Sequence, residues 1–426
     1  MKQFKLIITG LILGLILMAC STQGDNSVSI KETDKGYQLI RNGKPYFIKG
    51  AGGIGHYKTL AEAGGNSIRT WGVGHWEEAF KNAEKYDLTV FAGIWLEQER
   101  QGFDYSDSSA VAKQFERIKK DIMKYKDHPN LLMWGIGNEM DLNYTNPKVW
   151  DAVEQVAKYI HKVDGKHPTA TTTAFIEQEE VKLIKERCPN IDILSVNAYA
   201  GLSALAKFLD DFGWEGPYLL GEWGTHGHWE VQRTSWDEPI EFSSKKKANL
   251  YKKEYNQYVT SDPQSLGGYV FLWGQKQERT PTWYSMFLPN GNKTQAVDVM
   301  FKMWQGQWPQ NRAPILDSLR IDGLDAYSNV IVQPGSVHNA KVWIRDPDND
   351  SLEIKWELLH ETRDKRMGGD EENKPPVADY NLIKKEGKSF KFKAPQDTGA
   401  YRLFVYVYDR KGSGAHANIP FYVENE

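Results

Sequence analysis

The chain of 426 residues is 40% hydrophobic and 12% aromatic, which is enough for one large core and a smaller second one, so two domains are expected. Its 53 basic and 56 acidic residues give a formal net charge of only -3, and they are mixed along the chain without the basic face or acidic tail that would indicate nucleic-acid binding. This balance suits a neutral substrate.

The first 20 residues have the pattern of a targeting signal. Lys2 and Lys5 precede an apolar run from Leu6 to Ala19, which is shorter than a membrane-spanning helix requires. The run ends in "LMAC", which resembles the lipobox of bacterial lipoproteins and implies a lipidated Cys20. We therefore expect a signal peptide over 1–20, a polar tether over 21–36, and a lipid-anchored protein of the bacterial cell envelope (outer membrane, periplasmic face or cell surface). A plain secretory signal is the alternative.

The second cysteine, Cys188, lies far from Cys20 in the sequence. Acylation of Cys20 would leave it without an intramolecular disulfide partner. Cys188 is therefore predicted to be a core thiol.

A regular alternation of strands and helices is predicted over 37–312. After a hairpin around Asn42-Gly43, eight short apolar segments follow at 46–50, 66–71, 88–94, 131–137, 169–174, 193–199, 218–223 and 267–274. Segments with apolar residues three or four apart separate several of them, at 75–87, 110–126, 147–163, 179–187 and 245–259. Strands separated by helices imply a parallel sheet, and eight such units predict an α/β fold, a (β/α)8 TIM barrel.

An open doubly wound sheet is the rival architecture. It would carry a glycine-rich phosphate turn after its first strand and an acidic residue at the end of the next strand. The stretch "GAGGIGHYKTLAEAGGN" has the glycines but not the acidic residue. We interpret it as a loop.

The composition changes over 313–426, where short alternating apolar segments are separated by turns and no helical pattern is present. This predicts a C-terminal all-β immunoglobulin-like sandwich. One turn, "DPDNDS", carries Asp346, Asp348 and Asp350, a spacing that suits calcium but is more typical of a plain acidic turn.

The functional residues of a TIM barrel gather at the carboxyl ends of its strands. Glu139 and Glu222 end the fourth and seventh predicted strands, which lie on facing sides of the barrel. Two such carboxyl groups can flank one glycosidic bond, one as the acid and the other as nucleophile or base. Their separation decides between retention and inversion of the anomeric carbon, and the sequence does not supply it.

"GIGNEM" and "LLGEWG" resemble the "NE" and "GE" signatures of glycoside hydrolase clan A, the retaining (β/α)8 enzymes that include families 2 and 5. "GAGG" and "LAEAGGNSIRTW" also resemble the second-strand region of those families. The resemblance implies that Glu139 is the acid/base and Glu222 the nucleophile, with no cofactor and no metal. It further implies that Asn138 binds the sugar 2-hydroxyl, that Arg69 and Tyr199 hold the nucleophile, and that Trp273 forms the floor of the sugar subsite.

The remaining candidates are less specific. Trp71 and Trp223 are candidate sugar-stacking residues, with core packing as the alternative. Glu97, Glu99, Asp141 and Glu278 lie in predicted loops and are expected to be solvated, with a place in the lining of sugar subsites as the alternative. His226 and His228 have a zinc-like spacing without further ligands, and no G-x-S-x-G elbow indicates a serine hydrolase.

The sequence thus predicts a retaining β-glycoside hydrolase that acts on a polysaccharide and is a monomer. A barrel followed by one immunoglobulin-like domain resembles family 158, which implies an endo-glucanase specific for β-1,3-glucan. A loop such as "HGHWEVQRTSWDEPIEF" can instead close the site to an exo-acting pocket of the β-galactosidase or mannosidase type. A transglycosylase and a non-catalytic glycan-binding lipoprotein are the further alternatives.

Overall fold

The computed structural model describes residues 26–379 and 381–425. The predicted signal peptide and Cys20 lie outside these ranges. Within them, no helix is both long and apolar enough to cross a membrane.

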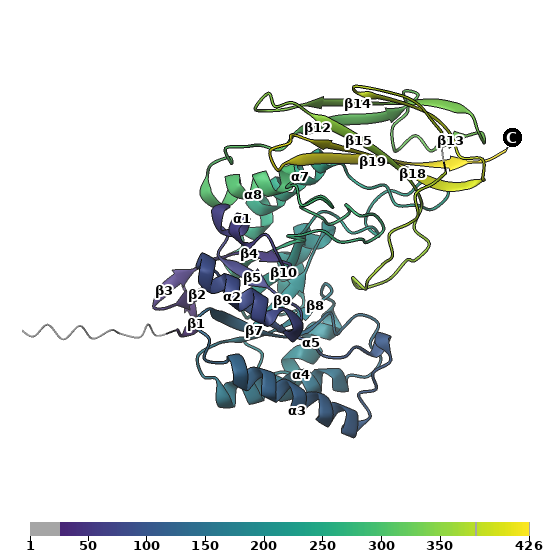
Figure 1. Ribbon diagram of the computed structural model, residues 1–426. Helices are drawn as coiled ribbons and strands as arrows, with labels where there is room; N and C mark the ends of the chain where they lie inside the picture. The colour runs from purple at the N-terminus through teal and green to yellow at the C-terminus, as the bar shows by residue number, and fades with distance from the viewer. Residues whose placement is uncertain (1–25, 380, 426) are drawn as a thin grey trace, which may run out of the picture.

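The predicted TIM barrel is confirmed. Eight parallel strands close into a barrel in the order β10-β11-β4-β5-β6-β7-β8-β9, with helices packed around it (Figure 1). The strands are β4 (Ile48–Gly52), β5 (Ser67–Arg69), β6 (Thr89–Ile94), β7 (Leu131–Asn138), β8 (Thr169–Thr173), β9 (Ile193–Asn197), β10 (Tyr218–Gly224) and β11 (Ser265–Phe271). Each corresponds to one of the eight predicted segments.

The helices of the barrel present one apolar face to the strands. In α4 (Lys148–Val163), the buried residues Val149, Val153, Val156 and Ile160 recur three or four positions apart, as an amphipathic helix requires. The five predicted helical segments correspond to α2 (Trp76–Tyr86), α3 (Ser108–Tyr125), α4, α5 (Gln178–Arg187), and α7 (Ser244–Glu254) with the π-helical turn Tyr255–Val259. Three further helices were not predicted: α1 (Tyr57–Glu62), α6 (Leu205–Asp211) and α8 (Gln295–Gln305).

Cys188 is buried at the end of α5, as predicted. Its thiol donates a hydrogen bond to the carbonyl of Trp150 at 3.2 Å. Burial raises the pKa of this thiol to about 12, so Cys188 is an unreactive core residue.

A small antiparallel sheet precedes the barrel and differs from the expected tether. It consists of β1 (Val28–Thr33), β2 (Gly36–Arg41) and β3 (Lys44–Tyr46), and the turn of its second hairpin is Asn42-Gly43, as predicted. The prediction of a polar tether over 21–36 is therefore wrong for the part occupied by β1. Val28 and Leu39 pack with residues such as Leu219 in one buried cluster, and this burial stabilises the strand.

The C-terminal domain is all-β, as predicted, and packs two four-stranded sheets face to face (Figure 1). The sheets have the orders β12-β14-β17-β16 and β13-β19-β18-β15. The strands are β12 (Ile315–Ile321), β13 (Val330–Val332), β14 (Val337–Arg345), β15 (Glu353–His360), β16 (Asn381–Glu386), β17 (Ser389–Lys393), β18 (Gly399–Tyr408) and β19 (Gly414–Val423). Alternating residues of both sheets, such as Val342 and Val405, form the hydrophobic core of this domain.

The acidic turn of this domain brings three carboxylates together. Oxygens of Asp346, Asp348 and Asp350 lie within 4.8 Å of one another. Asp346 accepts the backbone N–H groups of the other two residues, and Lys411 pairs with Asp350 at 2.5 Å. These contacts are those of an acidic turn, in which Oδ2 of Asp346 and Oδ2 of Asp350 are buried without a hydrogen-bond partner among the described residues.

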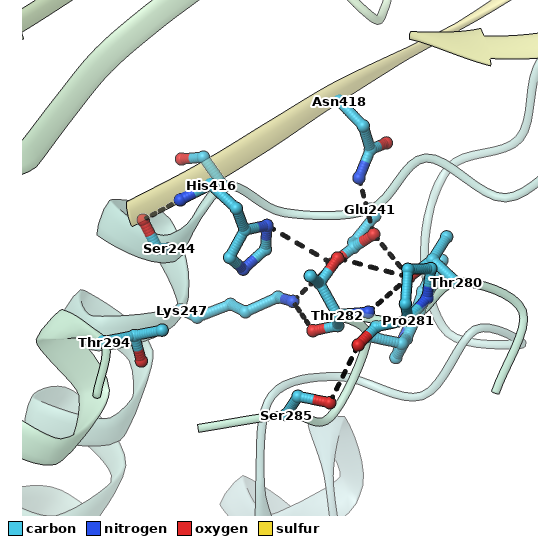
Figure 2. Close-up of polar contacts among 12 residues, drawn as sticks. Glu241, Ser244, Lys247, Thr280, Pro281, Thr282, Ser285, Thr294, His416 and Asn418 are labelled. Carbon is cyan, nitrogen blue, oxygen red and sulfur yellow. Dashed lines mark hydrogen bonds and ion pairs between the residues drawn. The ribbon is translucent and has the colours of Figure 1, made fainter. Parts of the chain in front are cut away.

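The barrel and the sandwich share a buried polar network, drawn in Figure 2. At its centre the Glu241 carboxylate accepts hydrogen bonds from Lys247 of α7 at 2.5 Å and from Asn418 of β19 at 2.6 Å. The hydroxyls of Thr280 and Thr282 donate to the same carboxylate at 2.6 and 2.8 Å. A buried ion pair with all its partners present tolerates little displacement, so this network fixes the sandwich on the barrel.

Candidate active site

A cavity of about 600 Å³ lies at the carboxyl ends of the barrel strands. Its lining comes from the barrel and from one loop of the sandwich. The barrel contributes Trp71, Trp95, Asn138, Glu139, Leu142, Ala174, Tyr199, Glu222, His228, Trp229, Phe271, Leu272, Lys276, Glu278 and Tyr284, and the sandwich contributes Arg366, Met367, Gly368, Gly369 and Asp370. Both predicted catalytic glutamates therefore face one space.

Glu222 is held by three donors at the end of β10. Arg69 and the indole N–H of Trp71 each bond its Oε1 at 2.9 Å, and the Tyr199 hydroxyl donates to its Oε2 at 2.6 Å. Glu222 and Arg69 are both buried. The guanidinium balances the negative charge of Glu222, and the three donors fix the orientation of its carboxylate.

Glu139 follows β7 in a left-handed conformation, with a φ of 52°. Its backbone N–H bonds the carbonyl of Thr172 at 2.8 Å, and this bond holds the chain where it turns out of the strand. Burial and the negative charge of Glu222 raise the pKa of Glu139 to about 7. A substantial fraction of Glu139 is therefore protonated at neutral pH, as a general acid requires.

A chain of side chains joins the two glutamates. Asn197, at the end of β9, donates to Glu139 Oε1 at 2.8 Å, while its Oδ1 accepts from Arg69 at 3.3 Å. Arg69 also bonds Asn138 Oδ1 at 2.6 Å. Arg69, Asn138 and Tyr199 thus lie where they were predicted, beside the two glutamates. Asn197 was not among the predicted site residues, although its position at a strand end is the signal that indicates it.

The structure does not bring two of the three predicted tryptophans to the cavity. Trp71 lines it, but Trp273 and Trp223 are 1% exposed. Trp273 packs against Phe287 and Trp304, and Trp223 packs against tyrosines of α7 and the turn that follows it. Successive side chains of a strand point to opposite faces, so Trp223 points away from the cavity that its neighbour Glu222 faces. Of the residues next to Trp273 in the sequence, Phe271 and Leu272 line the cavity.

Two carboxyl groups expected to be solvated are in fact sequestered. Glu278 is buried beside the cavity, with Lys276 at 2.9 Å. Asp141 accepts the backbone N–H of Ala174 through both oxygens, and burial together with the charge of Glu139 raises its pKa well above its ordinary value.

The other two predicted loop carboxylates do not line the cavity. Glu97 pairs with Arg117 at 3.1 Å. Glu99 accepts the backbone N–H groups of Thr145 and Asn146, so it fixes the loop after β7.

The alternating histidines are packing residues. His228 lines the cavity next to Trp229, with ring centroids 4.8 Å apart, and burial lowers its pKa to about 3. His226 lies 3.9 Å from Glu254. Within the described ranges, neither belongs to a cluster of three or more candidate metal ligands.

A TIM barrel with two glutamates of different environment facing one cavity is the arrangement found in the catalytic domains of glycoside hydrolases. Residues 62–302 match the family described as "Glycosyl hydrolases family 2, TIM barrel domain". This match spans more than half of the chain, and the chain belongs to that family. The expected closeness to family 158 has no support in this match and stays a prediction.

Solved structures of similar fold include β-glucuronidases. The β-glucuronidase of Dictyoglomus thermophilum is 17% identical, with a TM-score of 0.52 over 66% of this chain and 54% of its own. That of Bifidobacterium dentium is 16% identical, with a TM-score of 0.52 over 66% of this chain and 49% of its own. One from Ruminococcus gnavus is 15% identical, with a TM-score of 0.50 over 66% of this chain and 53% of its own. The chain thus spans about half the length of these proteins, and at such identities the likeness shows the fold alone. A search among curated proteins finds no significant match.

Proposed function

We propose that the protein is a retaining β-glycoside hydrolase with Glu222 as nucleophile and Glu139 as acid/base. The observation that carries this proposal is the contrast between two carboxyl groups in one cavity. Glu222 has a cation and two further donors around it, whereas burial and the charge of Glu222 raise the pKa of Glu139 to about 7. Such a pair suits an acid and a nucleophile at the same pH.

The reaction is a double displacement. A Glu222 oxygen bonds the anomeric carbon as the bond to the leaving oxygen breaks, and Glu139 gives its proton to that oxygen. Glu139 then takes a proton from water, the water oxygen attacks the anomeric carbon, and the ester to Glu222 breaks. Asn138, held by Arg69, is placed to bind the sugar beside the reacting carbon.

Glu222→Ala and Glu139→Gln variants test the assignment. We expect each to lower kcat/KM on an aryl β-glycoside with a poor leaving group by at least about a thousandfold, since each removes a group that acts in the transition state. Glu97→Gln is the matched control, because Glu97 is a carboxylate of a nearby loop that does not line the cavity. Proton NMR of the first-formed sugar should show the β-anomer. Wild-type rates in either site variant, or the α-anomer as first product, would contradict the proposal.

The cavity suits a neutral sugar. Of the described residues that line it, Lys276 is paired with Glu278 at 2.9 Å and Arg366 with Asp364 at 2.5 Å, so both cations already have carboxylate partners. We therefore propose a neutral β-linked oligosaccharide or polysaccharide as the substrate. In a panel of aryl β-glycosides, the glucoside, galactoside or mannoside should be cleaved at least about tenfold faster than the glucuronide. The reverse order would overturn this preference.

Endo action on β-1,3-glucan, expected from the order of the two domains, stays a prediction. Laminarin, mixed-linkage glucan, mannan, galactan and xylan, with product sizing over time, would report linkage and mode of attack together. Added acceptor sugar in the same assays distinguishes a hydrolase from a transglycosylase.

We also propose that a lipid on Cys20 attaches a monomeric enzyme to the bacterial cell envelope. The proposal rests on the apolar run and the "LMAC" sequence alone. Incorporation of a labelled fatty acid that a Cys20→Ala variant loses, and light scattering of the chain without residues 1–20, would test the anchor and the monomer.

A further inference from the structure

The connection between β15 and β16 leaves the sandwich and reaches the barrel, where it is visible as the long yellow-green loop of Figure 1. Its tip, Arg366–Asp370, lines the cavity that holds Glu139 and Glu222. We call this tip the bridging segment. It comes from a domain whose core is separate from that of the barrel.

The barrel alone would leave the cavity open on two opposite sides. Counted to the next α-helix, the connections after β4 (53–56), β5 (70–75) and β8 (174–177) are short, whereas those after β6 (95–107), β10 (225–243) and β11 (272–294) are long. In the closed barrel, β4 and β5 lie opposite β8 and β9. Short loops on facing sides would give a groove that is open at both ends.

The bridging segment contacts the barrel loops that lie on either side of β4 and β5. Asp370 accepts two hydrogen bonds from Arg100, at 2.8 and 3.2 Å, and one from Gln101 at 3.0 Å, both in the long connection after β6. The carbonyl of Gly369 accepts from Lys276, in the long connection after β11, at 2.5 Å. The segment therefore joins the two loops that flank the gap.

Close packing at the tip requires glycine. Gly368 has a φ of +57°, and a Cβ at this position would lie 2.8 Å from Arg100 Nη2 and 2.9 Å from Leu142 Cδ2. Gly369 has a φ of +73°. Two glycines in left-handed conformation let the backbone approach the barrel loops more closely than other residues allow.

The base of the loop is fixed as well. Glu372 is buried and accepts from the backbone and the guanidinium of Arg279 at 2.6 and 2.5 Å. Arg279 immediately precedes Thr280, which donates to Glu241 in the network of Figure 2. The same barrel loop thus holds both the sandwich and the bridging segment.

We propose that the bridging segment closes the glycone end of the active site, so that the enzyme accepts the terminal sugar at the non-reducing end of a β-linked chain. This inference rests on the proposed function and deepens it, and it replaces the endo action that the order of the two domains led us to expect. The sandwich is then part of the substrate site, since without it the cavity would be a groove suited to internal bonds.

The position of the acid gives the direction of the chain. Glu139 protonates the leaving oxygen and follows β7, next to β8, whose short connection leaves that side open. Trp71, which bonds the nucleophile, follows β5 on the closed side. The leaving group therefore departs over β8, and the sugar bonded to Glu222 lies against the bridging segment.

The test compares two substrates and three proteins. The substrates are the 4-nitrophenyl β-glycoside of the preferred monosaccharide and the glycoside of the matching β-linked disaccharide. The proteins are the full chain, a variant with Arg366–Asp370 replaced by two glycines, and the control Glu371→Ala, which removes one exposed charge next to the segment. Initial products are separated by chromatography, and thermal unfolding checks that each variant is folded.

We expect the parent to release nitrophenol from the monosaccharide at least about a hundredfold faster than it releases the intact disaccharide, and Glu371→Ala to keep this ratio. The shortened variant should lower the ratio at least tenfold by accepting the disaccharide. If this variant does not fold, Asp370→Ala, which removes only the bonds to Arg100 and Gln101, should lower the ratio in the same direction. Efficient release of intact disaccharide by the parent, or an unchanged ratio in a folded shortened variant, would overturn the inference while leaving the hydrolase assignment intact. A parent inactive on every substrate of the panel would instead refute the proposed function.

Discussion

Replacing Asn197 with alanine is expected to raise the pKa of Glu139. The Asn197 amide donates to Glu139 Oε1 at 2.8 Å, and a donor stabilises the charged carboxylate, so its loss favours the protonated form. A hydrogen bond to a charged group contributes about 1.5 to 3 kcal/mol, and about 1.4 kcal/mol corresponds to one pKa unit. Since water can replace the amide beside a cavity, we expect a rise of about one unit from the pKa of about 7.

The assay is the pH dependence of kcat/KM on an aryl β-glycoside with a poor leaving group, which reports ionisations of the free enzyme. Activity requires protonated Glu139, so the alkaline limb should move from about pH 7 to about pH 8 in Asn197→Ala. A dinitrophenyl glycoside is the control, because this leaving group needs no proton and its alkaline limb should be weak in both proteins. A limb that stays in place or moves to lower pH would refute the assigned role of the Asn197 bond.

Three further predictions concern the nucleophile and the domain interface. Tyr199→Phe removes the 2.6 Å hydrogen bond to Glu222 and should lower kcat/KM about 10- to 100-fold without loss of thermal stability. An unchanged kcat/KM would show that this hydrogen bond does not contribute to the reaction. Lys247→Met leaves the Glu241 carboxylate buried without its cation and should lower the free energy of unfolding in urea by about 3 to 5 kcal/mol, with partial recovery on adding Glu241→Gln. Burial lowers the pKa of His416 to about 3 from an ordinary 6.5, so between these pH values the unfolded chain protonates this histidine while the folded chain does not. The free energy of unfolding should therefore fall as the pH drops from 6.5 to 3, and His416→Gln should make this fall less steep. An equal dependence of the free energy of unfolding on pH in both proteins would contradict this prediction.

The placement of Glu139 and Glu222 at one cavity could be predicted because the ends of apolar strands can be recognised in a sequence. An apolar run that ends in a carboxylate, at Glu139 and again at Glu222, places both groups at the same end of a parallel barrel before any coordinate is known. Arg69 and Tyr199 follow from the same rule. Each of these side chains belongs to the strand that positions it, so local pattern was sufficient.

The direction of side chains near the strand ends was not predictable in the same way. Trp273 and Trp223 lie at strand ends, but the pleat and the turn after each strand decide which face a side chain takes, and both indoles are directed into the core. Strand β1 was missed since its apolar residues are few and are buried only against the base of the barrel. The bridging segment was beyond sequence reasoning, because its place at the cavity depends on how two domains dock.

The loop after β11 connects these observations. It carries Thr280 and Thr282, which bond the buried Glu241 at the domain interface, and a few residues earlier Lys276 and Glu278, which line the cavity. A shift of the sandwich would therefore move the lining of the substrate site as well as the bridging segment that Lys276 holds. A buried charge pair often stabilises a protein less than apolar side chains of the same volume would. One reason to retain such a pair is that it fixes the position of one domain relative to the other. In this protein, the network around Glu241 holds the sandwich next to the cavity wall, so the C-terminal domain and the barrel form one structural unit around the cavity.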